Sequence, residues 1–332
     1  MNKTASFSPV FIVGCQRSGS TMLGAMLGVH PDILCLPEAQ FVGDFLPADP
    51  ADHIEPDELL SAIEQHWRFR IWDFTLAGAR PRPGEIHSSF AATVVWLVRR
   101  YATFVGRHHA SIWIEQQPGH LKRAWHLAQH FPDARFLHIV RDGRAVALSL
   151  MERDWGQKRI LAAAKFWQER VALGLALEIA LGPARVRRVQ YEAVLNEPRE
   201  ELERLCEFLD LPFHPTMERP TGLRLPPFTR MDHQLIGSRL VGSRADRWRQ
   251  HVKRRDIEIF EGQTGDLLPL LGYDLVCGAQ PRRLGSFEKL QLTLQDHALR
   301  SVGQLRFARR RRRHLRKLRV LSRLGNGVEQ PA

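Results

Sequence analysis

The fold is decided by the stretch VFIVGCQRSGST, residues Val10–Thr21. Its apolar start, Val10–Val13, is typical of a buried strand, and the apolar spacing after Thr21 predicts a helix. The glycine-flanked turn between them points backbone N–H groups and the positive end of a helix dipole at one small volume. This arrangement suits a phosphate, and Arg17 adds a permanently charged guanidinium.

The spacing of this turn is close to that of a nucleotide-triphosphate loop, G-x-x-x-x-G-K-[ST]. Gly14, Gly19 and Thr21 fit that pattern, but Ser20 stands where the lysine belongs. The turn therefore resembles a phosphate loop whose positive charge has moved to Arg17. An ordinary strand–turn–helix connection made of small residues is the alternative at this point.

A second strand–turn–helix follows in the middle of the chain. Arg135–Val140 is a clear apolar strand, and a helix is predicted from Ala145 to Met151. Arg141 directly follows the strand, and Ser149 lies eight residues further on, in the helix. This places a second cation at the carboxyl end of a strand, where open α/β sheets bind ligands.

Strands and helices alternate along most of the chain, which predicts an α/β fold. We expect a single P-loop-like domain with a central parallel sheet of four or five strands, flanked by helices on both faces. This domain should span residues 1–280, and residues 281–332 should form a basic, amphipathic, helical and partly disordered tail.

Two further groups of residues are candidates for a site. Glu38 follows the predicted strand 33–36 at its carboxyl end, where a carboxylate can act as a general base. A solvated loop glutamate is the equal alternative. Arg244, Arg247 and Trp248 form a late basic cluster with an aromatic ring, which suits either a nucleotide or an exposed basic face.

Composition limits the other options. The 332 residues are 44% hydrophobic and contain no apolar run long enough to span a membrane. The four cysteines have no metal-ligand spacing, so neither a metal centre nor a disulfide framework is predicted. Without an export signal, we expect a cytoplasmic protein that is peripheral to the membrane only through its basic tail.

The basic charge is concentrated at the end of the chain. Residues 281–332 hold 14 Lys and Arg and 3 acidic residues, a net charge of +11, whereas residues 1–280 have a net charge of +1. Apolar residues recur every three or four positions there, before and after the run Arg309–Arg313. An anionic membrane surface or an acidic partner is favoured, a solvated helix is an alternative, and specific nucleic-acid binding is not expected.

The pair of motifs QRSGST and IVRDGRAVALS resembles the bacterial and Golgi-type branch of the sulfotransferases that use 3′-phosphoadenosine 5′-phosphosulfate (PAPS). The resemblance covers about residues 8–276. It implies a P-loop-like α/β domain that moves a sulfuryl group in line from PAPS to a hydroxyl, without a metal. The implied acceptor is a saccharide, glycolipid or polysaccharide.

The resemblance also implies roles for individual residues. Arg17, Ser18, Gly19, Ser20 and Thr21 would hold the 5′-phosphosulfate, and Arg17 would also neutralise charge on the leaving phosphate. Arg141 and Ser149 would bind the 3′-phosphate, and Glu38 would take the acceptor's proton. Arg244, Arg247 and Trp248 would belong to the late nucleotide-binding segment.

One element departs from the family pattern. Many relatives have a lysine before a proline where this chain reads Gln116-Gln117-Pro118, and an amide supplies no charge. A catalytically silent protein that binds the donor or a polyanion therefore stays an alternative. A P-loop nucleotide phosphotransferase is a second alternative, although Ser20 in the lysine position argues against it.

Overall fold

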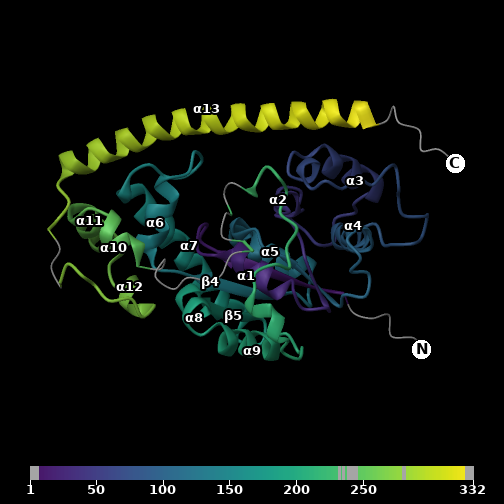
Figure 1. The fold of residues 1–332 in the computed structure, drawn as a ribbon, viewed down its shortest axis with the longest axis horizontal. Coiled ribbons are helices and arrows are strands. Elements are labelled where there is room, and N and C mark those ends of the chain that lie inside the picture. The colour runs from purple at the N-terminus through teal and green to yellow at the C-terminus, as the bar shows by residue number, and fades with distance from the viewer. Residues whose placement is uncertain (1–6, 231–232, 234–235, 238–245, 279–281, 326–332) are drawn as a thin grey trace. The chain divides into compact units, whose positions relative to one another are not determined.

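The computed structural model describes residues 7–230, 233, 236–237, 246–278 and 282–325. Its centre is a five-stranded, all-parallel sheet with the strand order β2-β3-β1-β4-β5. Figure 1 labels β4 and β5 of this sheet and the helices around it. The strands are β1 (Ser8–Gly14), β2 (Ile33–Cys35), β3 (Ile112–Glu115), β4 (Arg135–Val140) and β5 (Val186–Gln190). The predicted α/β fold with a parallel sheet is therefore confirmed.

Helices connect the strands and follow the last one. In the first part of the chain these are α1 (Ser20–Leu27), α2 (Gln40–Asp44), α3 (Pro56–Gln65), η1 (Phe69–Ile71), α4 (Phe90–Phe104), η2 (Pro118–Arg123), α5 (Ala124–His130), α6 (Gly143–Met151) and α7 (Ile160–Leu181). After β5 come α8 (Tyr191–Asn196), α9 (Pro198–Phe208), η3 (Pro215–Glu218), α10 (Arg247–His251), α11 (Arg254–Thr264), α12 (Leu267–Leu270) and α13 (Ser286–Gly325).

The segment after β3 begins with a tight turn. Pro118 starts the six-residue 3₁₀ helix η2, and α5 begins only after it. Buried His120 lies in η2 with Nε2 2.9 Å from Glu115 Oε2. This contact holds the first turn against the end of β3, where the tighter 3₁₀ geometry fits.

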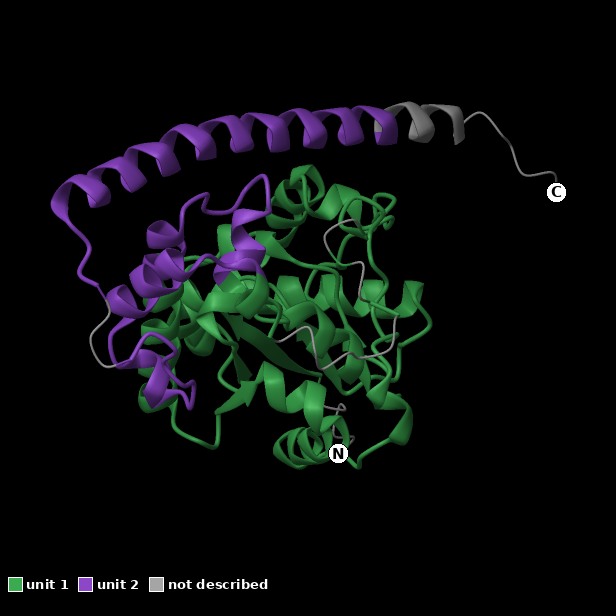
Figure 2. Cartoon of the chain, turned by 60° about the vertical axis from the view of Figure 1, so that its left-hand side comes forward, with its two compact units in different colours: residues 1–146, 166–250 green, residues 147–165, 251–332 purple. Residues whose placement is uncertain are grey.

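The chain forms two compact units (Figure 2). Unit 1 comprises residues 1–146 and 166–250 and contains the sheet. Unit 2 comprises residues 147–165 and 251–332 and contains α13. The predicted boundary after residue 280 was placed where the basic charge begins. The two units are instead defined by contacts within the chain, and residues 251–280 belong with the tail in unit 2. Among the described residues, no helix is long and apolar enough to cross a membrane.

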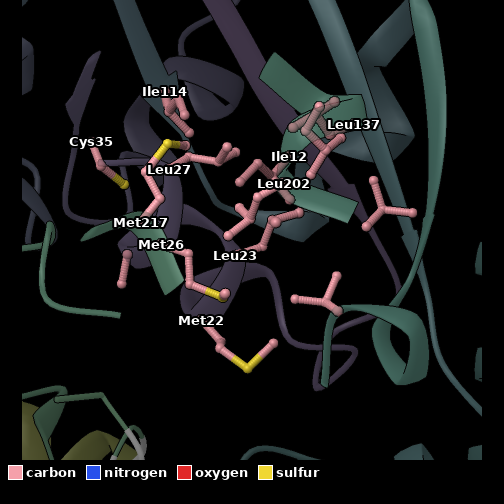
Figure 3. Close-up of a cluster of buried hydrophobic side chains, with 14 of the residues drawn as sticks. Ile12, Met22, Leu23, Met26, Leu27, Cys35, Ile114, Leu137, Leu202 and Met217 are labelled. Carbon is pink, nitrogen blue, oxygen red and sulfur yellow. The ribbon is translucent and has the colours of Figure 1, made fainter. Parts of the chain in front are cut away.

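Alternating side chains of the sheet build a core on each face. Ile12, Ile114 and Leu137 point to one face, where they meet Leu23 and Leu27 of α1 (Figure 3). On the other face, aromatic rings pack together through Phe11, Trp113, Phe131 and Phe136. Each fully buried side chain of this size contributes about 1.5–3 kcal/mol. The apolar side of α1 thus fixes the helix whose first turn follows β1.

A partly buried cluster of ionisable side chains joins α7 to the sheet. Gly174 lets α7 approach β4, since a Cβ there would lie 2.0 Å from His138 Nε2. Glu178 accepts hydrogen bonds from His138 Nδ1 and from Arg188 Nη2, each at 2.5 Å. Burial raises the pKa of Glu178, but these two hydrogen bonds outweigh it and lower the pKa to about 2.

A carboxylate with a lowered pKa stabilises the fold above its ordinary pKa of about 4.5, and this stabilisation is lost as the pH falls toward 2. We expect Glu178→Gln to lower the free energy of unfolding by about 1–3 kcal/mol at pH 7. The difference from wild type should shrink between pH 4.5 and pH 2. Urea unfolding at pH 7, 4.5 and 3 measures it.

The matched control is Glu203→Gln, which removes an exposed ion pair with Arg199 on α9. Such a pair is screened by solvent, so this variant should unfold like wild type at each pH. A loss in Glu178→Gln that does not depend on pH would contradict the assignment.

Candidate active site

The turn after β1 has an unusual backbone that packs closely on its neighbours. Gly14 has φ +151°, and a Cβ there would lie 2.4 Å from the carbonyl oxygen of Ile139 in β4. Arg17 and Gly19 also have positive φ, +73° and +103°. Gly19 caps α1, and no side chain of the described residues bonds to this cap. The first N–H groups of a helix have no partner within it, so this turn can bind an anion.

Arg141 and Tyr191 hold this turn from the neighbouring strands. Arg141 follows β4 and donates a hydrogen bond from Nη1 to the carbonyl oxygen of Arg17 at 3.1 Å. Its guanidinium carbon lies 4.2 Å from the centre of the Tyr191 ring, which follows β5. A Cβ on Gly19 would lie 2.4 Å from that ring. The structure thus joins two predicted residues, Arg17 and Arg141, by a direct hydrogen bond, and it adds Tyr191, which no motif in the sequence singled out.

The other predicted donor-binding residues are placed differently. Trp248 is only 1% exposed, and its ring lies 4.0 Å from the guanidinium carbon of buried Arg144, which Asp142 pairs at 2.8 Å. Arg247 is exposed beside it on α10. Ser149 lies on α6 in unit 2. Arg244 lies outside the described residues.

Glu38 follows β2 and forms an ion pair that the sequence did not reveal. Its Oε2 lies 2.8 Å from Arg68 Nη2, and both side chains are 15% exposed. Its carbonyl oxygen accepts a hydrogen bond from Trp72 Nε1 at 3.3 Å. Arg68 lies between α3 and η1, where no motif in the sequence singles it out.

A second carboxylate, Glu115 at the end of β3, is fully buried and ties this region together. Its Oε1 accepts a hydrogen bond from the backbone N–H of Ala39 at 2.7 Å, and its Oε2 accepts one from Gln117 N–H at 2.9 Å. Since Ala39 follows Glu38, this buried side chain fixes the backbone that carries Glu38. The only signal in the sequence was its place directly after a predicted strand.

A pocket lies beside Glu38, within unit 1. It has about 240 Å³ of empty space that opens to solvent. Its lining joins apolar and polar side chains: Pro37, Glu38, Arg68, Ile71, Trp72, Gln116, Leu225, Pro226, Thr229 and His233.

Several buried polar atoms in this region have no hydrogen-bond partner among the described residues. They are Gln16 Oε1, Ser18 Oγ, Gln116 Oε1, Arg141 Nε, and Nε and Nη1 of Arg170. A buried polar group without a hydrogen-bond partner destabilises the fold, so a polar ligand that supplies the missing hydrogen bonds would gain binding free energy. Gln116 and Arg141 directly follow β3 and β4, and Gln16 and Ser18 lie in the turn after β1, so these four residues lie at the carboxyl edge of the sheet.

Cys15, at the start of the turn, is not an activated thiol. Burial raises the pKa of Cys15, and the nearby Arg170 guanidinium offsets this only in part. The thiol therefore stays protonated at neutral pH, which agrees with a packing role and excludes a thiolate nucleophile.

With this geometry in place, the comparisons identify the family. The sulfotransferase family matches the chain over residues 9–215. The chain belongs to this family. The protein-tyrosine sulfotransferase of Drosophila melanogaster is 24% identical over 279 residues, which are 80% of this chain and 51% of that protein. Protein-tyrosine sulfotransferase A of Caenorhabditis elegans is 23% identical over 64% of this chain and 52% of its own length. The chain therefore spans about half the length of these relatives.

Solved sulfotransferase structures share the fold. The sulfotransferase domain from the olefin synthase of Synechococcus PCC 7002 has a TM-score of 0.51 and 21% identity, covering 80% of this chain and 98% of that domain. The sulfotransferase domain from the curacin biosynthetic pathway also has a TM-score of 0.51, with 16% identity, covering 82% and 100%. The resemblance drawn from the two motifs is thereby confirmed at the level of family and fold.

The sulfotransferase family implies PAPS as co-substrate, and the residues at the turn fit this anion. The open N–H groups of α1 and the unpartnered atoms of Ser18 and Arg141 are hydrogen-bond donors, as a phosphate or sulfate requires. The roles of individual residues remain predictions.

Gly19 offers a test of the turn. A side chain there would adopt a strained φ and collide with Tyr191, so Gly19→Ala should lower the free energy of unfolding by about 3 kcal/mol. Gly78→Ala is the matched control, because Gly78 has φ +79° but no atom within 4 Å of its added Cβ. It should cost only about 1 kcal/mol. Equal losses in denaturant unfolding would show that Tyr191 does not constrain the turn.

Proposed function

We propose that this protein is an enzyme that transfers a sulfuryl group from PAPS to an acceptor hydroxyl. The observation that carries this proposal is the carboxyl edge of the sheet. There the turn after β1, the ion-paired Glu38 after β2 and Gln116 after β3, whose Oε1 has no hydrogen-bond partner among the described residues, follow adjacent strands of one sheet. A donor site and an acceptor pocket can meet at such an edge.

The donor would be held from both ends. Arg17 and the loop Ser18–Thr21 would bind the 5′-phosphosulfate, while Arg141 and Ser149 would bind the 3′-phosphate. Arg170 would add a further cation near the turn, because its guanidinium is buried and lacks hydrogen-bond partners on two nitrogens among the described residues. Arg244 and Arg247 would contribute at the nucleotide, and Trp248 would act by supporting Arg144.

The transfer would rest on positioning and fixed charge. PAPS supplies, when bound, an activated sulfuryl group whose bond to the 5′-phosphate oxygen breaks as the acceptor oxygen attacks. Arg17 and the N–H groups of α1 would stabilise the charge that grows on that phosphate. Glu38 would take the acceptor's proton on Oε1, while Arg68 holds Oε2. Gln116 would donate a hydrogen bond where many relatives have a lysine.

The acceptor would present its hydroxyl from a ring. Trp72, Ile71 and Pro226 give the pocket apolar walls, and Glu38 and Arg68 give it a polar end. Such a lining suits a saccharide, a glycolipid headgroup or the end of a polysaccharide. The relatives named for protein tyrosine add a phenol as the second candidate. Parallel assays with saccharide and tyrosyl-peptide acceptors distinguish the two.

Ligand binding tests the donor site independently of the acceptor. Adenosine 3′,5′-bisphosphate at a hundred times its dissociation constant should stabilise the fold by about 2.7 kcal/mol, because it binds only the folded state. AMP lacks the 3′-phosphate and should stabilise less in the same thermal unfolding assay. Stabilisation by ATP with magnesium, but not by the bisphosphate, would favour a nucleotide phosphotransferase and contradict the proposal.

Glu38→Gln tests the base. The variant should lose at least about a hundredfold in transfer rate, a typical contribution of general base catalysis, yet keep its stabilisation by the bisphosphate. Glu64→Gln is the matched control. Glu64 lies on α3, where it forms an ion pair with Arg80, and it does not line the pocket. Transfer by Glu38→Gln at the wild-type rate would show that another group takes the proton. Bisphosphate binding without transfer to any acceptor would instead indicate a silent binding protein.

A further inference from the structure

One side of α13 packs against other residues of unit 2. This 40-residue helix is about 60 Å long, and unit 2 contains all of it. Asp296 is 3% exposed, and its Oδ1 accepts hydrogen bonds from the backbone N–H groups of Lys158 and Arg159 at 2.6 and 3.0 Å. A Cβ on Gly303 would lie 2.2 Å from the carbonyl oxygen of Asp154. Asp296 and Gly303 therefore mark the face of α13 that packs on residues 154–159.

The opposite side of α13 is apolar and exposed. We define the outer stripe as Phe287, Leu290, Leu294 and Leu305, which are 81%, 56%, 60% and 60% exposed. At about 100° per residue these four positions fall within about 60° of one another. They lie roughly half a turn away from Asp296 and Gly303. The outer stripe is therefore not the face that holds α13 to its own unit.

Beyond Leu305, the same side of α13 carries arginines instead of apolar residues. Arg309, Arg312 and Arg316 lie on the same side by the same count, and all three are exposed. Residues 297–325 contain 11 Lys and Arg and no acidic residue. The two acidic residues earlier in α13 are already engaged, since Glu288 pairs with Arg255 at 2.5 Å and Asp296 binds the segment described above. The helix thus has no carboxylate of its own to neutralise these arginines.

We propose that the outer stripe of α13 binds an anionic lipid surface, with the helix lying in the plane of the interface. Its apolar residues would enter the boundary between headgroups and acyl chains, and Arg309, Arg312 and Arg316 would contact the lipid phosphates and carboxylates. A nucleic acid would use the arginines but not four exposed apolar side chains. The combination of both along one line of the helix favours a lipid surface. This proposal does not depend on the sulfotransferase reaction.

Flotation of the full chain with vesicles tests it. Vesicles of phosphatidylcholine with 30% phosphatidylserine should bind at least tenfold more protein than pure phosphatidylcholine vesicles, and 500 mM NaCl should reduce this binding. Leu290→Gln combined with Leu294→Gln should lower binding at least fivefold, because it removes the inserted surface. Arg309→Gln, Arg312→Gln and Arg316→Gln together should lower it by a similar factor.

The matched control removes equally exposed apolar side chains elsewhere. Ile179→Gln combined with Leu270→Gln replaces residues that are 85% and 66% exposed on α7 and α12, and should bind vesicles like wild type. Equal loss in this control would overturn the proposal, as would wild-type binding by the leucine variant. Binding to duplex DNA or polyglutamate that needs the arginines but not the leucines, without binding to vesicles, would assign α13 to a soluble polyanion and also overturn it. Far-UV circular dichroism confirms that each variant keeps its helices.

Discussion

The close backbone approach at the end of β1 is the constraint on which the candidate site depends. Gly14 leaves no room for a side chain against β4, and Gly19 leaves none against Tyr191. The turn has positive φ at Gly14, Arg17 and Gly19, and the N–H groups at the start of α1 have no side-chain cap among the described residues. The apolar side of α1 then locks that orientation, because Leu23 and Leu27 are fully buried against the sheet.

The loops around the proposed acceptor pocket depend on one buried carboxylate, that of Glu115. Glu115 receives backbone hydrogen bonds from Ala39 and Gln117, so one side chain sets the positions of the loops after β2 and β3. Arg68 then orients Glu38 through Oε2. A base that must meet an acceptor within hydrogen-bond distance needs this kind of support, because small displacements weaken catalysis strongly. Glu115 is thus a positioning residue for the proposed base.

Gln116 stands where many relatives of the family have a lysine, and the structure shows what surrounds it. Gln116 lines the pocket beside Glu38 and has a buried Oε1 without a partner among the described residues. Arg170 is a buried cation that the motifs did not include, and its charge acts on Cys15 at the start of the turn. Two nitrogens of its guanidinium, Nε and Nη1, have no hydrogen-bond partner among the described residues, and such a buried cation is costly to the fold.

Local pattern determined much of this protein by itself. The parallel sheet, the strands at residues 10–13 and 135–140, and the glycine turn followed by a helix could be predicted, because apolar periodicity and glycine spacing act over a few residues. Tertiary structure alone decided which side chains meet. Arg68 and Glu38 are 30 residues apart, Tyr191 reaches Gly19 from β5, and Trp248 is occupied by Arg144. Such contacts depend on strand order and on the path of irregular segments, and a single sequence carries no local signal for either.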